Sequence, residues 1–200
     1  MSKVTTYGAF GRVAIGYSCP WVAKYSKGVD TYTNSDGRRL ARGVGASISP
    51  DTADDNNFYA DNQVAESDAG TFTGGTLTLT PDGLHPEAER YILGLPEPDT
   101  DGITHDGDSA IAPDLSYGHV TKYRCNNQDL YRPEVLCKVK FHKIEAEYET
   151  QGEEIDWQTQ ELTASIMRSD NANHDWRLFG EDWTTEAEAE AQLKSMLNVA

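Results

Sequence analysis

Apolar and polar residues alternate along much of this chain, and this pattern constrains the fold more than any other feature of the sequence. The alternation is plain in segment 135–141, where Lys138 and Lys140 flank Val139. In segment 162–167, Leu, Ala and Ile alternate with Thr, Ser and Met. Successive side chains of a strand point to opposite faces, so this spacing predicts strands that are buried on one face. We therefore expect a mainly β fold.

Turn residues divide the alternating segments and predict how the strands pair. Segments 117–125 and 130–141 are expected to pair on either side of Asn126-Asn127-Gln128-Asp129. Segment 71–80 alternates Thr with Phe, Gly and Leu, which predicts a half-buried strand with a bulge at its two glycines.

The first fifty residues predict further strands with two interruptions. Segments 12–17 and 21–25 alternate on either side of Pro20. Because proline cannot donate a ladder hydrogen bond, this strand is expected to lie at a sheet edge or to break there. Asn34-Ser35-Asp36-Gly37 predicts a tight hairpin turn, since Asp-Gly readily adopts positive φ angles. Another strand is expected to follow over 38–49.

Two helices are predicted, one before the middle of the chain and one at its end. Pro86 suits the first position of a helix and Gly94 its end. Thr185 and Glu188 have the spacing of a capping box, which predicts an amphipathic helix at about 184–198. That helix can pack on its own domain or contact another subunit, and the sequence leaves both interpretations open.

Charge is distributed very unevenly between the two ends of the chain. The net charge is −16, which argues against a surface that binds nucleic acid by neutralising phosphates. Residues 1–50 nevertheless hold seven Lys and Arg against two acids. Segment 50–70 holds six acids and no base, and segments 97–113 and 145–161 are acidic too. Such asymmetry fits two solvated faces, or a head-to-tail contact between a basic and an acidic surface.

The length and composition predict one soluble domain. The 200 residues are 38 % hydrophobic, enough for a single domain over 1–200 with its core at about 10–168. No apolar run is long enough to cross a bilayer, and the first residues lack the apolar stretch of a secretory signal. The protein is therefore expected to be made in a cytoplasm, to stay soluble and not to insert in a membrane.

No catalytic or metal-binding motif is recognisable in the sequence. Three widely spaced cysteines lack the ligand pairs of a zinc site and are expected to be reduced, buried thiols: Cys19, Cys125 and Cys137. The Asp-rich loops lack the spacing of a calcium-binding EF-hand. His105 beside Asp106 is the nearest approach to an acid–base pair, but sequence neighbours in a loop rarely share a useful geometry. We expect no enzyme, cofactor or metal.

Exposed aromatic residues leave one alternative open, a carbohydrate-binding module on a β-sandwich. Its binding platform would draw on the many tyrosines and on the tryptophans, which are Trp21, Trp157, Trp176 and Trp183. Most tryptophans in a domain of this size are core residues, and these four form no cluster along the sequence.

Several elements, taken in order, resemble the major tail protein family of long-tailed, non-contractile bacteriophages. The first half carries Phe58-Tyr59-Ala60-Asp61-Asn62 with Glu66, where the family shows a "YADD…VE" element. An alternating strand over 75–80 and a helix that ends in Leu93-Gly94 follow, as in the family. The second half agrees more loosely, in segments 113–120, 138–141 ("KxxF") and 157–162 ("FQTxxL"). Asn62 replaces a common Asp and Trp157 the usual Phe.

The resemblance implies a β-sandwich or barrel-like core of two packed sheets with a flanking helix and a structural role in the virion. Six copies would close into a ring, and stacked rings would form the tail tube that conducts double-stranded DNA into the host. The tape-measure, terminator and distal tail proteins would be further partners. Another tail or baseplate component with the same fold is the alternative within this class. An acidic lumen would repel DNA phosphates.

Ring and stack contacts join different surfaces of neighbouring copies, which the charge asymmetry can supply. The 50–70 excursion has an aromatic tip, and long excursions of this kind are more often functional than idle. We predict that it reaches the next ring. The expected contact residues are Phe58, Tyr59, Asp61, Arg38, Arg39 and Arg42.

Overall fold

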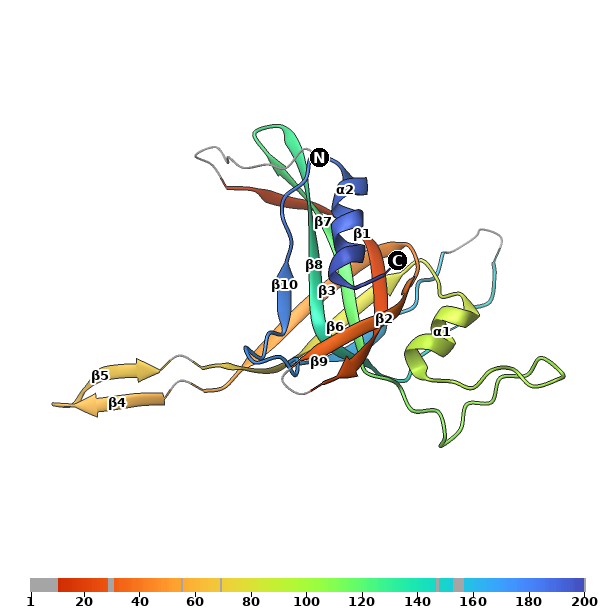
Figure 1. The fold of residues 1–200 in the computed structure, drawn as a ribbon, viewed down its shortest axis with the longest axis horizontal. Coiled ribbons are helices and arrows are strands. Elements are labelled where there is room, and N and C mark those ends of the chain that lie inside the picture. Colours follow the sequence, from red (N-terminus) through yellow and green to blue (C-terminus); the bar gives the residue numbers. More distant parts are fainter. Residues whose placement is uncertain are drawn as a thin grey trace.

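The computed structural model describes residues 11–28, 31–54, 56–68, 70–146, 148–152 and 157–199 and is mainly β, as the alternation predicted. Among these residues, eight strands form one antiparallel sheet in the order β2-β1-β7-β8-β9-β6-β3, with β10 paired to β8, while β4 and β5 pair only with each other (Figure 1). The strands are β1 (Val13–Lys27), β2 (Tyr32–Arg39), β3 (Gly43–Thr52), β4 (Asn56–Ala60), β5 (Gln63–Asp68), β6 (Phe72–Pro81), β7 (Leu115–Cys125), β8 (Gln128–Phe141), β9 (Leu162–Met167) and β10 (Arg177–Phe179). The helices are α1 (Pro86–Leu93) and α2 (Glu186–Met196).

The large sheet folds over on itself at the corner between β2 and β3, so that its two ends approach each other. At this corner the Leu40 N–H donates to the Pro20 carbonyl of β1 over 2.9 Å. The Tyr17 ring of β1 also lies against Gly43 of β3, where an added Cβ would come within 2.1 Å of the ring. Glycine at this position therefore permits the close approach of the two layers, and a sandwich-like core results.

The main core lies inside the folded sheet, and α1 covers one end of it (Figure 1). Side chains of both layers are fully buried there, including Leu77 of β6, Tyr117 of β7 and Ile166 of β9. From α1, Tyr91 and Ile92 pack into the same core. The predicted caps of α1 are confirmed: Pro86 is its first residue, and Gly94 ends it with a φ of 67°.

A second, smaller core lies between α2 and the outer face of β7 and β8. Leu193 of α2 and Leu197, the residue that caps the end of this helix, are fully buried against Val120 and Val135. The structure thus places the C-terminal helix on its own domain, which the sequence left open. The predicted capping residue is confirmed, because the Thr185 hydroxyl accepts a hydrogen bond from the Glu188 N–H.

The expected interruption at Pro20 is wrong in one respect. β1 continues through Pro20 without a break, and it pairs with β7 along most of its length but with β2 only from Trp21 onward. The register with β7 shifts between Ser18 and Trp21, and Cys19 has a φ of 54°. This bulge removes Pro20 from the ladder, so its missing N–H leaves no neighbour without a donor.

The expected hairpin turn at Asp36-Gly37 is also wrong. Asp36 has the predicted positive φ, 50°, but it lies inside β2, where the register with β1 shifts between Val22 and Lys24. The positive φ therefore serves a bulge and not a chain reversal. The strand expected over 38–49 is correspondingly divided, since β2 ends at Arg39 and β3 begins at Gly43.

Other local predictions are confirmed. Asn126 and Asn127 form the tight turn between β7 and β8 with φ angles of 48° and 62°. β6 falls where a half-buried strand was expected, although its register shift lies beside Thr73 and not at the glycine pair. The 97–113 segment is a loop, as expected. Residues 147 and 153–156 of the third acidic run lie outside the described residues, and 157–161 form no strand before β9.

Candidate functional site

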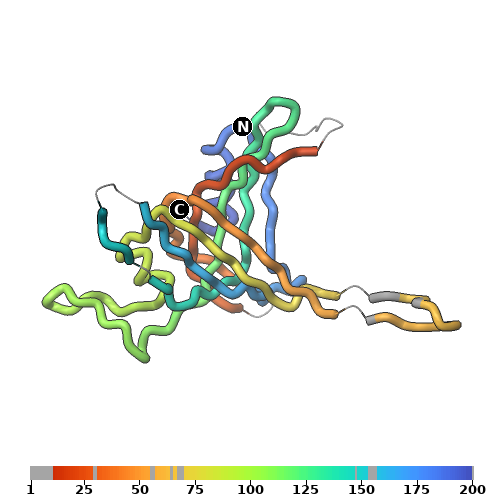
Figure 2. The backbone as a smooth tube through the Cα atoms, turned by 180° about the vertical axis from the view of Figure 1, so that it is seen from behind, coloured from red at the N-terminus to blue at the C-terminus, as the bar shows by residue number. Residues whose placement is uncertain are grey.

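A two-stranded arm projects from the body of the molecule (Figures 1 and 2). β3 and β6 lead out to β4 and β5, which form a sheet of their own. The chain reverses at Asp61 and Asn62, whose φ angles of 50° and 62° match the turn that best fits the twist of a hairpin. Residues 56–68 of the acidic 50–70 excursion therefore form a hairpin with the resembling residues 58–62 at its tip.

The arm exposes apolar surface that its own body does not cover. Phe58 and Tyr59 are each 64 % exposed. A lone pair of short strands is marginally stable in water, because each strand gains hydrogen bonds on one side only. Unpaired strand edges and exposed aromatic rings are also features of surfaces that pair with other chains. The arm has the properties of a protein-binding element.

The three arginines expected at a contact do not lie together. The guanidinium of Arg38 lies 4.1 Å from the ring centre of Tyr91, next to α1. Arg39 ends β2 and is exposed. Arg42 is exposed in the corner before β3, with its Nε 2.5 Å from an Asp82 carboxylate oxygen. Arg38 lines a cavity that Arg39 and Arg42 do not line, so the expected basic surface is divided between different sites.

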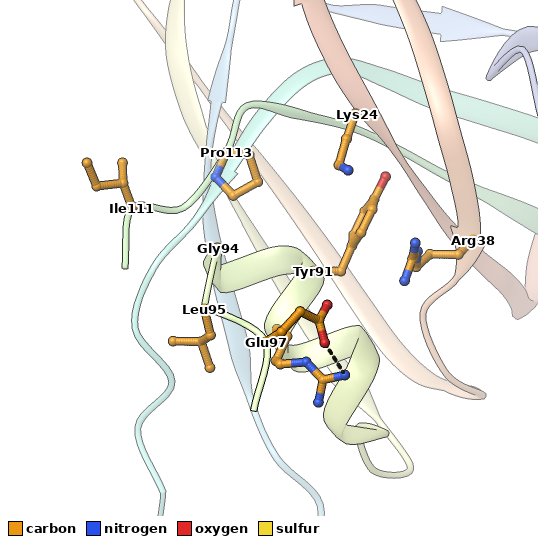
Figure 3. A pocket seen from close by; sticks show the side chains of 9 residues that line it. Lys24, Arg38, Tyr91, Gly94, Leu95, Glu97, Ile111 and Pro113 are labelled. Carbon is orange, nitrogen blue, oxygen red and sulfur yellow. Dashed lines mark ion pairs between the residues drawn. The ribbon is translucent and has the colours of Figure 1, made fainter. Parts of the chain in front are cut away.

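The cavity at Arg38 has a volume of about 340 Å³ and lies beside α1 (Figure 3). We call it the α1 cavity. Lys24 of β1 and Arg90 of α1 supply two further cations to its lining. Neither residue was predicted as a site residue, because no pattern in the sequence indicates that β1, β2 and α1 lie side by side.

His105 and its sequence neighbour Asp106 do not pair, which agrees with the expectation that they share no useful geometry. His105 Nε2 lies 3.1 Å from Asp99, and Asp106 pairs with Lys143 instead. Both Asp101 and Ile103 donate backbone N–H groups to one Asp99 oxygen, over 2.9 Å each. These hydrogen bonds, that to Ile103 first, hold the pKa of Asp99 below its usual range. The His105–Asp99 pair thus stabilises the conformation of an exposed loop.

A group of polar side chains is buried in the sheet, among β1, β7, β8 and β10. The Tyr17 and Tyr117 hydroxyls are 2.7 Å apart, and His119 contacts both rings. Burial first, and then the nearby positive charge of Arg177, together lower the pKa of His119 to about 4. Glu134 accepts from Arg177 Nε over 2.7 Å. With His119 5 % and Glu134 3 % exposed, this group is closed to a substrate.

The tryptophans are dispersed, which weakens the interpretation as a sugar-binding platform. Trp176 stacks on Phe72 with ring centres 4.4 Å apart, and Trp183 is 8 % exposed in the smaller core. Trp21 donates its ring N–H to Glu190 of α2. Trp157 alone of the four is strongly exposed, at 85 %.

The three cysteines are buried thiols, as expected. Within the ranges that the structure describes, no three His, Cys, Asp or Glu side chains gather as metal ligands would. None of the helices in that part of the chain is long and apolar enough to cross a membrane.

No protein-family model matches the chain, and no curated protein matches its sequence.

Proposed function

We propose that this protein is a structural protein that assembles into stacked hexameric rings and so forms the tail tube of a long-tailed, non-contractile bacteriophage. The observation that carries the proposal is the projecting arm with exposed Phe58 and Tyr59. A projecting two-stranded hairpin is marginally stable by itself, so a second chain that packs against it would stabilise it.

Two further observations support the same function. Two of the segments that resemble the tail protein family lie on regular elements, since 58–62 form the arm tip and Leu93-Gly94 end α1, whereas 157–161 form no strand. The folded sheet also agrees with the sandwich or barrel-like core that the resemblance implies.

The net charge of −16 suits a conduit for double-stranded DNA. Acidic groups on a lumen wall repel phosphates, whereas a basic wall would bind DNA through counterion release and retain it. In this role the tape-measure, terminator and distal tail proteins are the expected partners, and the virion tail is the expected location.

Electron microscopy of the concentrated, purified protein tests the proposal. Six-membered rings or tubes are expected from the full chain. The decisive variant replaces residues 54–70 by Asn-Gly, because the Ala53 N–H already donates to the Thr71 carbonyl over 2.9 Å and a two-residue turn can close there. This arm-deleted variant should fold and stay unpolymerised.

Tubes of normal length from the arm-deleted variant would contradict the role of the arm. A full chain that stays monomeric at high concentration and gains thermal stability with a glycan would instead support a carbohydrate-binding module. Rings that never stack would favour another tail or baseplate component.

A further inference from the structure

We propose that the α1 cavity is a carboxylate-binding site and that its occupant is an acidic side chain from the arm of a second copy of this chain. The inference rests on the proposed self-assembly and adds the surface that receives the arm. The cavity is lined by the cations Lys24, Arg38 and Arg90, the ring of Tyr91, and the apolar residues Leu95 and Pro113.

Tyr91 organises the cations of the cavity. Its hydroxyl donates to the Asp36 carbonyl over 2.5 Å, which fixes the ring between β2 and α1. Arg38 lies 4.1 Å and Lys24 5.3 Å from the ring centre, so the ring face attracts both cations (Figure 3). Both cations line the cavity on this side, and Glu97 is the one carboxylate among the described residues of the same lining.

The carboxylates already present do not use all of the donors. Asp36 contacts both Lys24, at 2.8 Å, and Arg38, at 3.1 Å, and is itself 46 % exposed. Arg90 is only 18 % exposed, yet its contact with Glu97 is 3.5 Å long, and Glu97 is 87 % exposed. The Nε–H groups of Arg38 and Arg90 are buried and donate to no partner within the described structure.

Unused guanidinium donors in a partly desolvated cavity are suited to a carboxylate. A guanidinium presents its N–H groups in a planar fork that matches the two oxygens of a carboxylate or of a phosphate. Burial of the donors increases the benefit, because an unpaired buried N–H costs more than an exposed one. Lys24 and Arg38 lower the pKa of Asp36, which reflects the positive potential on this side.

The arm carries the matching groups, but it cannot bring them to its own cavity. Asp61 at its tip and Glu66 on β5 are exposed, and the arm has no base. The arm and α1 lie toward opposite ends of the longest axis in both views (Figures 1 and 2). A contact between them must join two copies, and because it joins different surfaces it continues from copy to copy.

Two variants with opposite defects test this inference. The cavity variant, Arg38→Gln with Arg90→Gln, keeps the arm, and the arm-deleted variant keeps the cavity. In sedimentation velocity, each variant alone should give one species that does not grow further. For the cavity variant, the protein concentration at which assembly begins should be at least tenfold higher than for the parent chain. An equimolar mixture of the two variants should form a species twice the size of either variant alone, and no larger species. In this species the arm of the cavity variant occupies the cavity of the arm-deleted variant, and no other intact cavity–arm pair remains.

Matched controls separate this contact from a general effect of charge. Arg39→Gln with Arg42→Gln removes two exposed arginines of the same segment outside the cavity and should assemble normally. Asp61→Asn with Glu66→Gln should reproduce the cavity variant, whereas Asp101→Asn with Asp108→Asn, in the 97–113 loop, should not. Circular dichroism must show a native fold for every variant.

The outcomes distinguish this inference from the proposed function. The inference is overturned if the cavity variant forms tubes like the parent chain, or if the mixture forms no larger species. Neither result contradicts the proposal that the parent chain forms a tube. A parent chain that never assembles overturns the tube and the inference together. Binding of inorganic phosphate to the arm-deleted variant, without a larger species in the mixture, would identify a site for small anions and overturn the arm as occupant.

Discussion

Glu134 and Arg177 form an ion pair inside the protein, with Glu134 Oε1 2.7 Å from Arg177 Nε and 2.5 Å from its Nη2. The carboxylate is 3 % exposed, and its burial raises its pKa although Arg177 opposes the shift. A carboxylate in this position stays ionised at neutral pH only because the guanidinium compensates for its desolvation.

Replacing Arg177 by Met should therefore destabilise the protein by about 3–5 kcal/mol at neutral pH, because it leaves a buried charge uncompensated. The loss should be smaller below the usual pKa of Glu, since a protonated Glu134 needs no counter-charge. Urea unfolding at several pH values measures both effects. Arg177→Met with Glu134→Gln is the control, and it should recover most of the loss. An equal deficit at acidic and neutral pH would contradict this account.

His119 should make stability fall as the solution is acidified. Its folded pKa, about 4, lies below the usual 6.5, so the unfolded chain takes up a proton first and the stabilisation is lost as the pH falls from 6.5 toward 4. His119→Gln should remove this part of the pH dependence, worth up to about 1.4 kcal/mol per pH unit. His105→Gln, at an exposed histidine, is the control. The difference in the free energy of unfolding between the parent chain and the His119→Gln variant should be constant above pH 7.

Gly118 and Leu193 should behave as a coupled pair. A Cβ at Gly118 would lie 2.6 Å from Leu193 Cδ1, so Gly118→Ala should cost about 1–3 kcal/mol by overpacking. Leu193→Ala should cost about 2–5 kcal/mol by leaving a cavity. In the double variant the new methyl group occupies part of that cavity, so the free energy of unfolding should fall by less than the sum. If the losses of unfolding free energy from the two single variants were fully additive in thermal or urea unfolding, Leu193 of α2 would not pack against Gly118.

The arm tip should affect assembly without affecting folding. Phe58→Ser with Tyr59→Ser removes rings that are each 64 % exposed, so the free energy of unfolding of the monomer should change by less than about 0.5 kcal/mol. Assembly, measured by light scattering and electron microscopy, should be strongly reduced. Tyr148→Ser, at a tyrosine that is 85 % exposed outside the arm, should assemble like the parent. Equal assembly of both variants would contradict the proposed contact.

Features that depend on neighbouring residues were predictable from the sequence. The caps at Pro86, Gly94 and Thr185 and the turn at Asn126-Asn127 follow from backbone preferences that act over a few residues. The alternation in β8 and β9 follows from burial of one sheet face, so strand identity could be derived as well.

The Asp36-Gly37 pair shows where such reasoning stops. Its preference for positive φ was correctly inferred, but a hairpin turn and a bulge both use that angle, and only the register of β2 against β1 selects the bulge. Pro20 is similar, because its position in a central strand depends on the bulge beside it.

By itself, the sequence determined a mainly β domain, its two helices, its buried thiols and an acidic excursion, because each follows from local spacing or composition. The tertiary structure alone decided that this excursion is an arm at the far end from α1, and that α2 packs on the sheet of its own chain. It also decided that Arg38 lines one cavity with Lys24 and Arg90, whereas Arg39 and Arg42 do not line it. These are contacts between residues far apart in the chain, and their geometry depends on how the sheet folds over at the β2–β3 corner.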